Sequence, residues 1–142
     1  MDGTKPIRFP FGEHGVDDED GVLCKGGEYP PLLEIDEAIV RCLRVPDPEP
    51  GLYGPKLIFE NEVLRPPEYA GTRLVMYANY FETPRPLSKI MHLAVIATGQ
   101  RRIRNITKKM FQGKGFRCSL RTCGRGAAAY SVIDTFLERL EK

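Results

Sequence analysis

The sequence contains no long apolar run. Across its 142 residues, no stretch approaches the roughly 18 consecutive apolar residues that a membrane-spanning helix requires. The first twenty residues also lack the apolar segment of a secretory signal. They carry five acids from Glu13 to Asp20, whereas a mitochondrial presequence is basic and poor in acids. These features predict a protein of the cytoplasm or nucleus, with an atypical mitochondrial import signal left open.

Cysteine is sparse, and its spacing does not suit a metal site. The four cysteines, Cys24, Cys42, Cys118 and Cys123, are widely scattered and form no C-x-x-C pair. Zinc sites and the disulfide frameworks of secreted proteins both depend on closely patterned cysteines. We therefore expect idle or buried thiols in a reducing compartment, with no metal site and no cofactor.

Acidic residues are also scarce in the C-terminal part of the chain. Residues 1–85 hold 9 Lys and Arg against 16 Asp and Glu, whereas residues 86–142 hold 12 against 3. No acid occurs between Arg101 and Arg125, a segment that contains nine basic residues. A field of one sign attracts polyanions and gains free energy from counterion release, whereas an ordinary solvated surface mixes both signs. The charge pattern therefore favours nucleic acid as a partner.

The N-terminal half divides into four segments. Residues 1–30 are rich in Gly, Pro and acids, which predicts a flexible acidic arm. Apolar residues at helical spacing from Leu32 to Leu43 suggest a short helix. The four prolines and two glycines of residues 45–55 predict a loop. Residues 56–64 and 72–81 are β-prone runs that we expect to form two strands.

The basic half predicts a strand, a helix, a second strand and a second helix. Residues 90–97 form a nearly continuous apolar run, typical of a central strand. Residues 101–112 place their apolar side chains on one helical stripe, and residues 116–121 alternate as in a half-buried strand. An apolar stripe from Ala129 to Leu140 predicts the last helix. The expected fold class is α+β, or α/β-like, with a small mixed sheet.

Two short motifs carry a resemblance to a known family. Residues 99–105 read Gly-Gln-Arg-Arg-Ile-Arg-Asn, and about twenty residues later residues 123–126 read Cys-Gly-Arg-Gly before an apolar stripe. Together with the expected order of elements, residues 88–141 resemble the Alba family. They are more similar to its eukaryotic members, which include the Alba-fold subunits of RNase P and RNase MRP. Alba proteins usually continue into a two-stranded hairpin that this chain lacks.

The resemblance implies an RNA-binding protein that forms a homodimer or a heterodimer with an Alba-like partner. It implies a pair of basic residues after the first strand, here Gln100 and Arg101. Because Gln100 is not basic, Arg102 would supply the second positive charge. It also implies an Asn at the head of the first helix, here Asn105, and a Gly-Arg turn before the second. Since the hairpin is missing, we expect the strands of residues 56–64 and 72–81 to complete the sheet, as in a permuted Alba-like domain.

The residues themselves support phosphate binding, independently of the resemblance to the Alba family. Two turns that each open a helix would direct free backbone N–H groups outward, and arginine matches phosphate geometry. The candidate nucleic-acid-binding residues are Gln100, Arg101, Arg102, Arg104, Asn105, Lys108, Arg121, Gly124 and Arg125. Tyr77, Tyr80 and Phe81 suit stacking on bases, although packing against the protein is the commoner use of such aromatic residues.

Catalytic alternatives are weak. Residues 124–129 satisfy the form G-x-G-x-x-A of a dinucleotide fingerprint, but the required following strand and its acid are missing. Neither His14 nor His92 has a nearby nucleophile or carboxylate in a catalytic arrangement. The sequence therefore predicts a non-enzymatic RNA-binding protein, DNA being the other polyanion it could take, within a ribonucleoprotein. The alternative is a structural subunit of a large ribonucleoprotein such as a ribosome, held mainly by protein neighbours.

Overall fold

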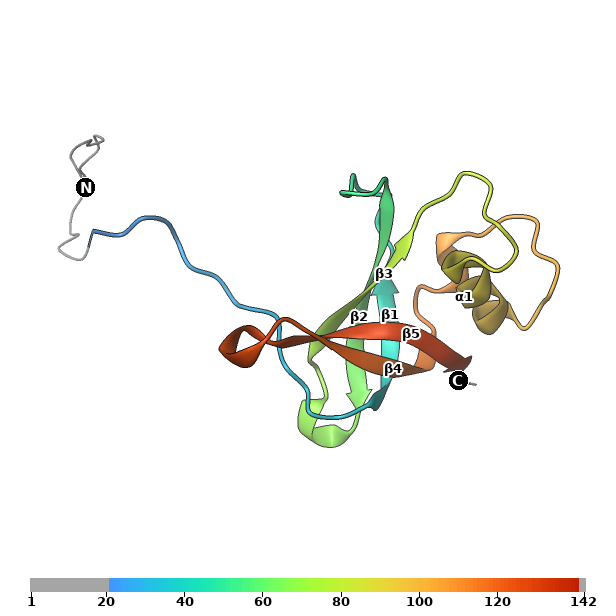
Figure 1. Ribbon diagram of the computed structural model, residues 1–142. Coiled ribbons are helices and arrows are strands. Elements are labelled where there is room, and N and C mark those ends of the chain that lie inside the picture. Colours follow the sequence, from blue (N-terminus) through green and yellow to red (C-terminus); the bar gives the residue numbers. More distant parts are fainter. Residues whose placement is uncertain (1–20, 141–142) are drawn as a thin grey trace.

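Residues 21–140, which the computed structural model describes, form five strands and one α-helix (Figure 1). The strands are β1 (Glu37–Arg44), β2 (Lys56–Arg65), β3 (Arg73–Asn79), β4 (Gly115–Cys123) and β5 (Tyr130–Arg139), and the helix is α1 (Lys89–Thr98). Three single 3₁₀ turns, Pro67–Tyr69, Lys108–Met110 and Gly126–Ala128, lie in the connections.

The five strands make one sheet that closes into a barrel. Their order is β1-β2-β3-β5-β4, and β4 also pairs with β1. Neighbouring strands are antiparallel except β3 and β5, which run parallel. α1 lies between β3 and β4 in the sequence and packs against β5 and β3. This five-stranded Greek-key arrangement is the architecture of the OB-fold.

The barrel closes around a core of alternating side chains. Ala38, Val40 and Cys42 of β1 point inward and are buried, as the period of two in a strand requires. Four phenylalanines fill the centre: the rings of Phe116 and Phe136 stack with centroids 4.0 Å apart, and Phe59 meets Phe111 and Phe136 edge-on. Burial in this core raises the pKa of the Cys42 and Cys118 thiols to about 12.

α1 corrects the prediction of a strand over residues 90–97. Ile90, Leu93, Ala94 and Ala97 are its buried residues, at the spacing of one helical face. The Ser88 hydroxyl accepts a hydrogen bond from the Met91 amide as the N-cap, and left-handed Gly99 ends the helix with φ 73°. A short apolar run fits a helix or a strand equally well, and the capping residues decide between them.

Other expected elements also change. The helix predicted at Leu32–Leu43 is wrong, because this segment contains β1. Residues 101–112 form a loop with a single 3₁₀ turn in place of a helix, and the expected last helix is β5. The strands predicted at residues 56–64, 72–81 and 116–121 are confirmed as β2, β3 and β4.

The predicted α+β, Alba-like module is therefore wrong. Strands from both halves of the sequence do share one sheet, since β1 pairs with β4 and β3 pairs with β5. They close a barrel, however, and do not complete a permuted Alba-like sheet. Residues 1–20 of the expected acidic arm lie outside the described residues, and residues 21–30 form neither helix nor strand. No helix among residues 21–140 is long and apolar enough to cross a membrane.

Candidate nucleic-acid interface

The structure separates the residues that the sequence predicted to form one site. The loop after α1 carries five of them, Gln100, Arg101, Arg102, Arg104 and Asn105, and Lys108 begins the next 3₁₀ turn. Gly124 and Arg125 lie in the turn between β4 and β5, which projects from the opposite side of the barrel (Figure 1). Neither turn opens an α-helix, so the expected pair of helix N-termini is absent from the described residues. Arg121 lies in β4, and all nine residues are exposed, but they do not form one site.

Isoleucine packing sets the shape of the loop after α1. The Gln100 amide donates to the Thr98 hydroxyl at 3.1 Å, which turns the chain away from the helix. Ile103 and Ile106 then pack against the core, while Arg101 and Arg104 stay exposed. This alternation keeps the arginines in solvent even though the loop lacks regular structure.

Lys89, at the start of α1, links two hollows on the surface. The first, of about 550 Å³, is lined by Lys56, Tyr77, Phe81, Arg85 and Lys89 among others. The second, of about 770 Å³, lies along α1 and is lined by Lys89, His92, Arg101 and Asp134 among others. The two hollows together join β3, α1 and β5 with the first arginine of the loop after α1. We call this surface the Lys89 face.

The Lys89 face carries an excess of positive charge. Its basic residues are Lys56, Arg85, Lys89 and Arg101, and Arg121 lies at its edge, 3.2 Å from Asp134. Asp134 is the one acid that lines either hollow within residues 21–140. Burial lowers the pKa of Lys89, Asp134 partly offsets this effect, and the Arg121 guanidinium lowers the pKa further. An anion bound there would relieve the repulsion between Lys89 and Arg121.

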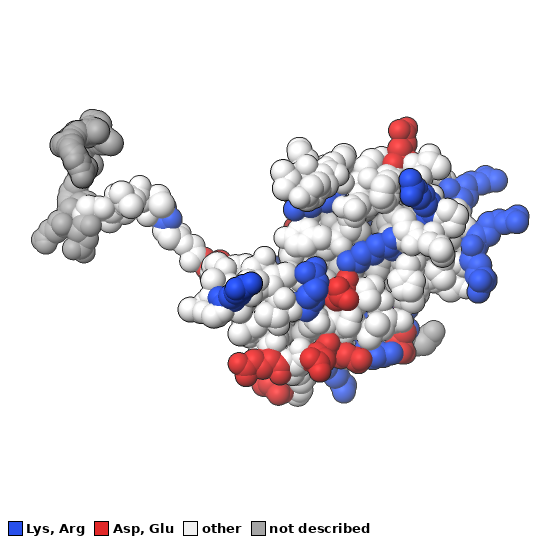
Figure 2. Space-filling view, viewed as in Figure 1, with Lys and Arg blue, Asp and Glu red and all other residues white. Residues whose placement is uncertain are grey.

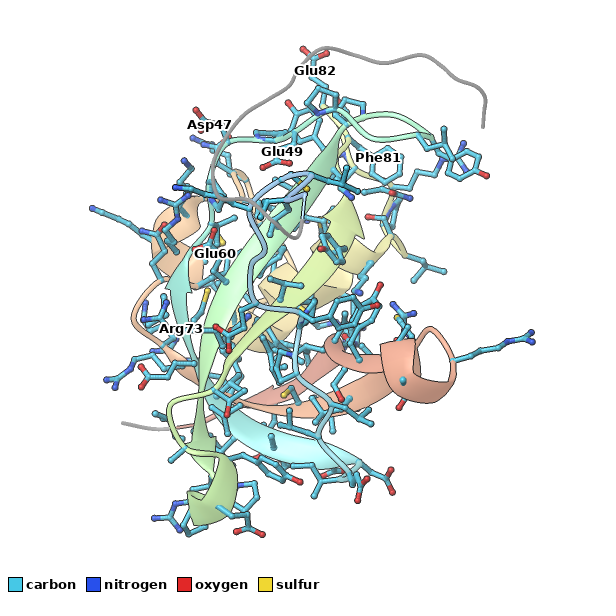
Figure 3. The ribbon with its side chains drawn as sticks, turned by 90° about the vertical axis from the view of Figure 1, so that its left-hand side faces the viewer. Asp47, Glu49, Glu60, Arg73, Phe81 and Glu82 are labelled. Atoms are coloured by element: carbon cyan, nitrogen blue, oxygen red, sulfur yellow. The ribbon has the colours of Figure 1, made fainter. Side chains whose placement is uncertain are left out.

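Aromatic rings lie among these charges. Tyr77, on the outer side of β3, is 39% exposed, and the Lys56 Nζ lies 4.6 Å from its ring centroid. Phe81, just beyond β3, is 42% exposed. Figure 3 shows Phe81 beside the end of the strands, whereas Glu82 points away from the barrel. A separate aromatic pair lies at the start of β5, where Tyr29 packs edge-on against Tyr130. Partly exposed rings bordered by cations are suited to stacking on unpaired bases.

The outer surface that β1 and β2 share with β4 and the end of β5 is neutralised. Arg117 pairs with Glu37 at 2.8 Å and with Glu138 at 3.0 Å, and Arg44 pairs with Glu60 at 3.1 Å. We call this surface the paired face. In Figure 2 the acidic side chains gather along the lower edge of the molecule, whereas basic ones cross its middle and cluster on the right. Basic residues that already hold carboxylates offer little to a phosphate.

Sequence reasoning missed Lys56, Arg85 and Lys89. The first two belong to the half with a net negative charge, and Lys89 directly precedes the strand predicted over residues 90–97. For Tyr77 the sequence alone favours packing against the protein over stacking on bases. The available signal was the alternation of β3, which buries Leu74, Met76 and Ala78 and therefore turns Tyr77 outward.

No family model matches the sequence, and no curated protein matches it. The site must therefore be argued from its own geometry. Within residues 21–140, no group of three or more His, Cys, Asp or Glu side chains is placed to hold a metal ion.

Proposed function

We propose that the protein binds single-stranded nucleic acid, RNA foremost, on the Lys89 face without catalysing a reaction. The observation that carries this proposal is the combination of exposed Tyr77 and Phe81 with four basic residues and one acid around two adjoining hollows. A phosphodiester strand presents alternating charge and flat bases, and this face offers partners for both.

The barrel architecture supports the proposal by analogy. OB-folds commonly bind oligonucleotides on the outer surface of strands 2 and 3. Lys56 lies on β2 and Tyr77 on β3, at neighbouring positions in this surface. Fold alone does not assign function, so the argument depends on the side chains and not on the barrel.

Binding would combine two physical effects. Phosphates near Lys56, Lys89 and Arg101 would release counterions, which makes the affinity fall steeply with salt. Bases stacked on Tyr77 and Phe81 would each contribute about 1–3 kcal/mol with little preference for sequence. The protein would therefore recognise unpaired strands by shape and charge, as a component of a ribonucleoprotein.

A structural role in a large ribonucleoprotein is the second candidate. Gly21 to Glu28 leaves the barrel as an extended segment, on which Val22 is 70% and Leu23 98% exposed (Figure 1). Exposed apolar residues on an extended segment suit insertion between the protein and RNA neighbours of an assembly.

The experiment compares two double variants of equal charge change. Lys56→Ala with Lys89→Ala removes two cations from the Lys89 face, whereas Arg41→Ala with Arg65→Ala removes two exposed cations from β1 and β2. Fluorescence anisotropy with a labelled oligouridine of about 12 nucleotides, within the site size of one OB-fold, measures the affinity.

We expect the first variant to bind tenfold or more weakly at about 0.1 M salt, with a shallower salt dependence. The second variant should bind about as tightly as the parent. Equal losses in both variants would show that binding is diffuse, and no binding by the parent would reject the function itself.

A further inference from the structure

A separate cleft lies at one end of the barrel. Its volume is about 690 Å³, and it is bounded by the β1–β2 loop, the loop before α1 and the loop after α1. Its walls are largely apolar and include Pro46, Phe81, Pro84, Ile103 and Ile106. The Val45 amide donates to the Gln112 side chain at 3.0 Å, which helps hold the β1–β2 loop beside the barrel. The cleft is therefore a feature of three loops, and it adjoins the two hollows at Lys89, with which it shares Phe81 and Arg101.

The rim of the cleft is basic. Arg101, Arg104 and Lys108 line it, and Glu82 is the one acidic residue among its lining side chains within residues 21–140. Lys108 already holds Asp47 at 2.8 Å. None of the ion pairs formed between described residues involves Arg101 or Arg104. An occupant of this cleft should therefore combine apolar side chains with a nearby run of acids.

The chain itself contains such a sequence. Ile7, Phe9 and Phe11 alternate with other residues, and five acids follow between Glu13 and Asp20. An aromatic group followed by a cluster of acids complements an apolar cleft with an arginine rim in both polarity and charge. Residues 7–20 thus supply in one short stretch what the cleft lacks.

The direction of the arm indicates which barrel would receive it. The Leu33 amide donates to the Ser131 hydroxyl at 2.8 Å, so the arm is anchored to β5 from this point. Tyr29 also holds the barrel, because its hydroxyl donates to the Ala128 carbonyl at 2.8 Å and its ring packs edge-on against Tyr130. Gly21 to Glu28 then leads away from the barrel, on the side opposite α1 and the loops of the cleft (Figure 1). Eight extended residues span about 27 Å at the usual rise per residue. The arm is therefore long enough to reach a neighbouring molecule.

We propose that this cleft receives residues 7–20 of a second copy of the chain. Phe9 and Phe11 enter between the proline-bearing loops, and the acids from Asp17 to Asp20 face Arg101 and Arg104. The proposal does not depend on nucleic-acid binding. Because Arg101 lines both the cleft and the Lys89 face, the docked acids would nevertheless compete with phosphate at that residue.

The test uses the full chain and two matched variants. Phe9→Ser with Phe11→Ser alters the proposed ligand, whereas Val22→Ser with Leu23→Ser removes two exposed apolar side chains outside it. Sedimentation across a concentration series measures self-association. We expect the first variant to weaken self-association by about tenfold or more, as the loss of two buried aromatic side chains predicts, and the second to match the parent.

Methyl NMR identifies the surface involved. The Ile103 and Ile106 methyl signals should shift between the parent and the Phe9, Phe11 variant but stay unchanged in the Val22, Leu23 variant. A nitroxide on the exposed Cys24 of unlabelled copies, with Cys123→Ser to avoid a second label, should broaden these methyl signals in isotope-labelled copies mixed with them.

Three outcomes would overturn the proposal. The first is a parent that stays monomeric at every concentration, even if the methyl signals shift, because the segment would then occupy its own barrel. The second is equal self-association of the two variants. The third is a pair of results that would assign the cleft to nucleic acid: the Ile103 and Ile106 methyl signals shift when oligouridine is added to the parent, but they do not differ between the parent and the Phe9, Phe11 variant. Oligouridine binding by the parent is measured separately, so the proposed function can fail without affecting this result.

Discussion

The Lys89 face and the paired face present similar residue types with different consequences. On the paired face, Arg117 lies between Glu37 and Glu138, so its charge is used within the protein. On the Lys89 face, Lys56 lies against the Tyr77 ring and Lys89 faces Arg121, with Asp134 as the nearest acid. The number of basic residues in a sequence therefore says less about binding than the placement of the acids.

The largest effect should come from the core that both faces share. Phe136→Ala removes a ring that stacks on Phe116 with centroids 4.0 Å apart in the centre of the barrel. We expect the free energy of unfolding to fall by about 3–5 kcal/mol, measured by urea denaturation. The control is Phe81→Ala, which truncates a ring that is 42% exposed and should cost much less. Equal losses would mean that Phe81 is packed more tightly than its exposure indicates.

A smaller effect should distinguish stacking from charge on the Lys89 face. Tyr77→Leu keeps an apolar side chain but removes the ring, so the binding of oligouridine should weaken by about 1–3 kcal/mol. Its salt dependence should remain that of the parent because no cation is lost. Tyr77→Phe, which retains the ring, serves as the control in the same anisotropy titration. If Leu and Phe behave alike, the ring does not contact a base.

The smallest effect should come from removing a single acid from each face. Asp134→Asn leaves the Lys89 face without its nearest carboxylate, and oligouridine should bind a few times more tightly at low salt, as expected for one unit charge. Glu138→Gln makes the same change on the paired face, where Arg117 retains Glu37 at 2.8 Å, and should leave the affinity unchanged. A tighter complex with the Glu138 variant instead would place the ligand on the paired face.

The sequence predicted three of the five strands. β1 also buries alternate residues, but its apolar residues fit helical spacing as well, and a helix was predicted there. β2, β3 and β4 bury alternate residues, and their apolar pattern predicted them correctly. Residues 129–140 predicted a helix because Ile133, Phe136 and Leu140 fall at helical spacing, whereas the structure forms β5 and buries Ser131, Val132 and Ile133 in succession. The N-terminal segment covers the outer side of β5 here, since the Ser131 amide donates to the Pro31 carbonyl at 2.8 Å. A contact across about a hundred residues cannot be read from local periodicity.

The candidate site was only partly predictable for a related reason. The basic segment was recognised, and Arg101 does line the Lys89 face. Lys56 and Tyr77 lie far from it in sequence and join it only because β3 pairs with β5 and α1 packs across both. The Alba-like motifs suggested a loop geometry that depends on two helices, and the chain forms neither of them. The composition of the basic segment indicates that the protein attracts polyanions, whereas the strand pairing determines which residues form the binding surface.

The parallel pairing of β3 with β5 has a mechanical consequence. This pairing is the seam of the barrel, joined in register at Met76 and Ile133, whereas the antiparallel ladders extend over many residues. The Lys89 face straddles the seam, with Tyr77 on β3 and Asp134 on β5. A strand of nucleic acid lying across the seam would contact both β3 and β5, and would hold together the two neighbouring strands that share the shortest ladder. The ligand would then slow the opening of the barrel itself, and amide exchange at Met76 and Ile133 would report how firmly the seam is closed.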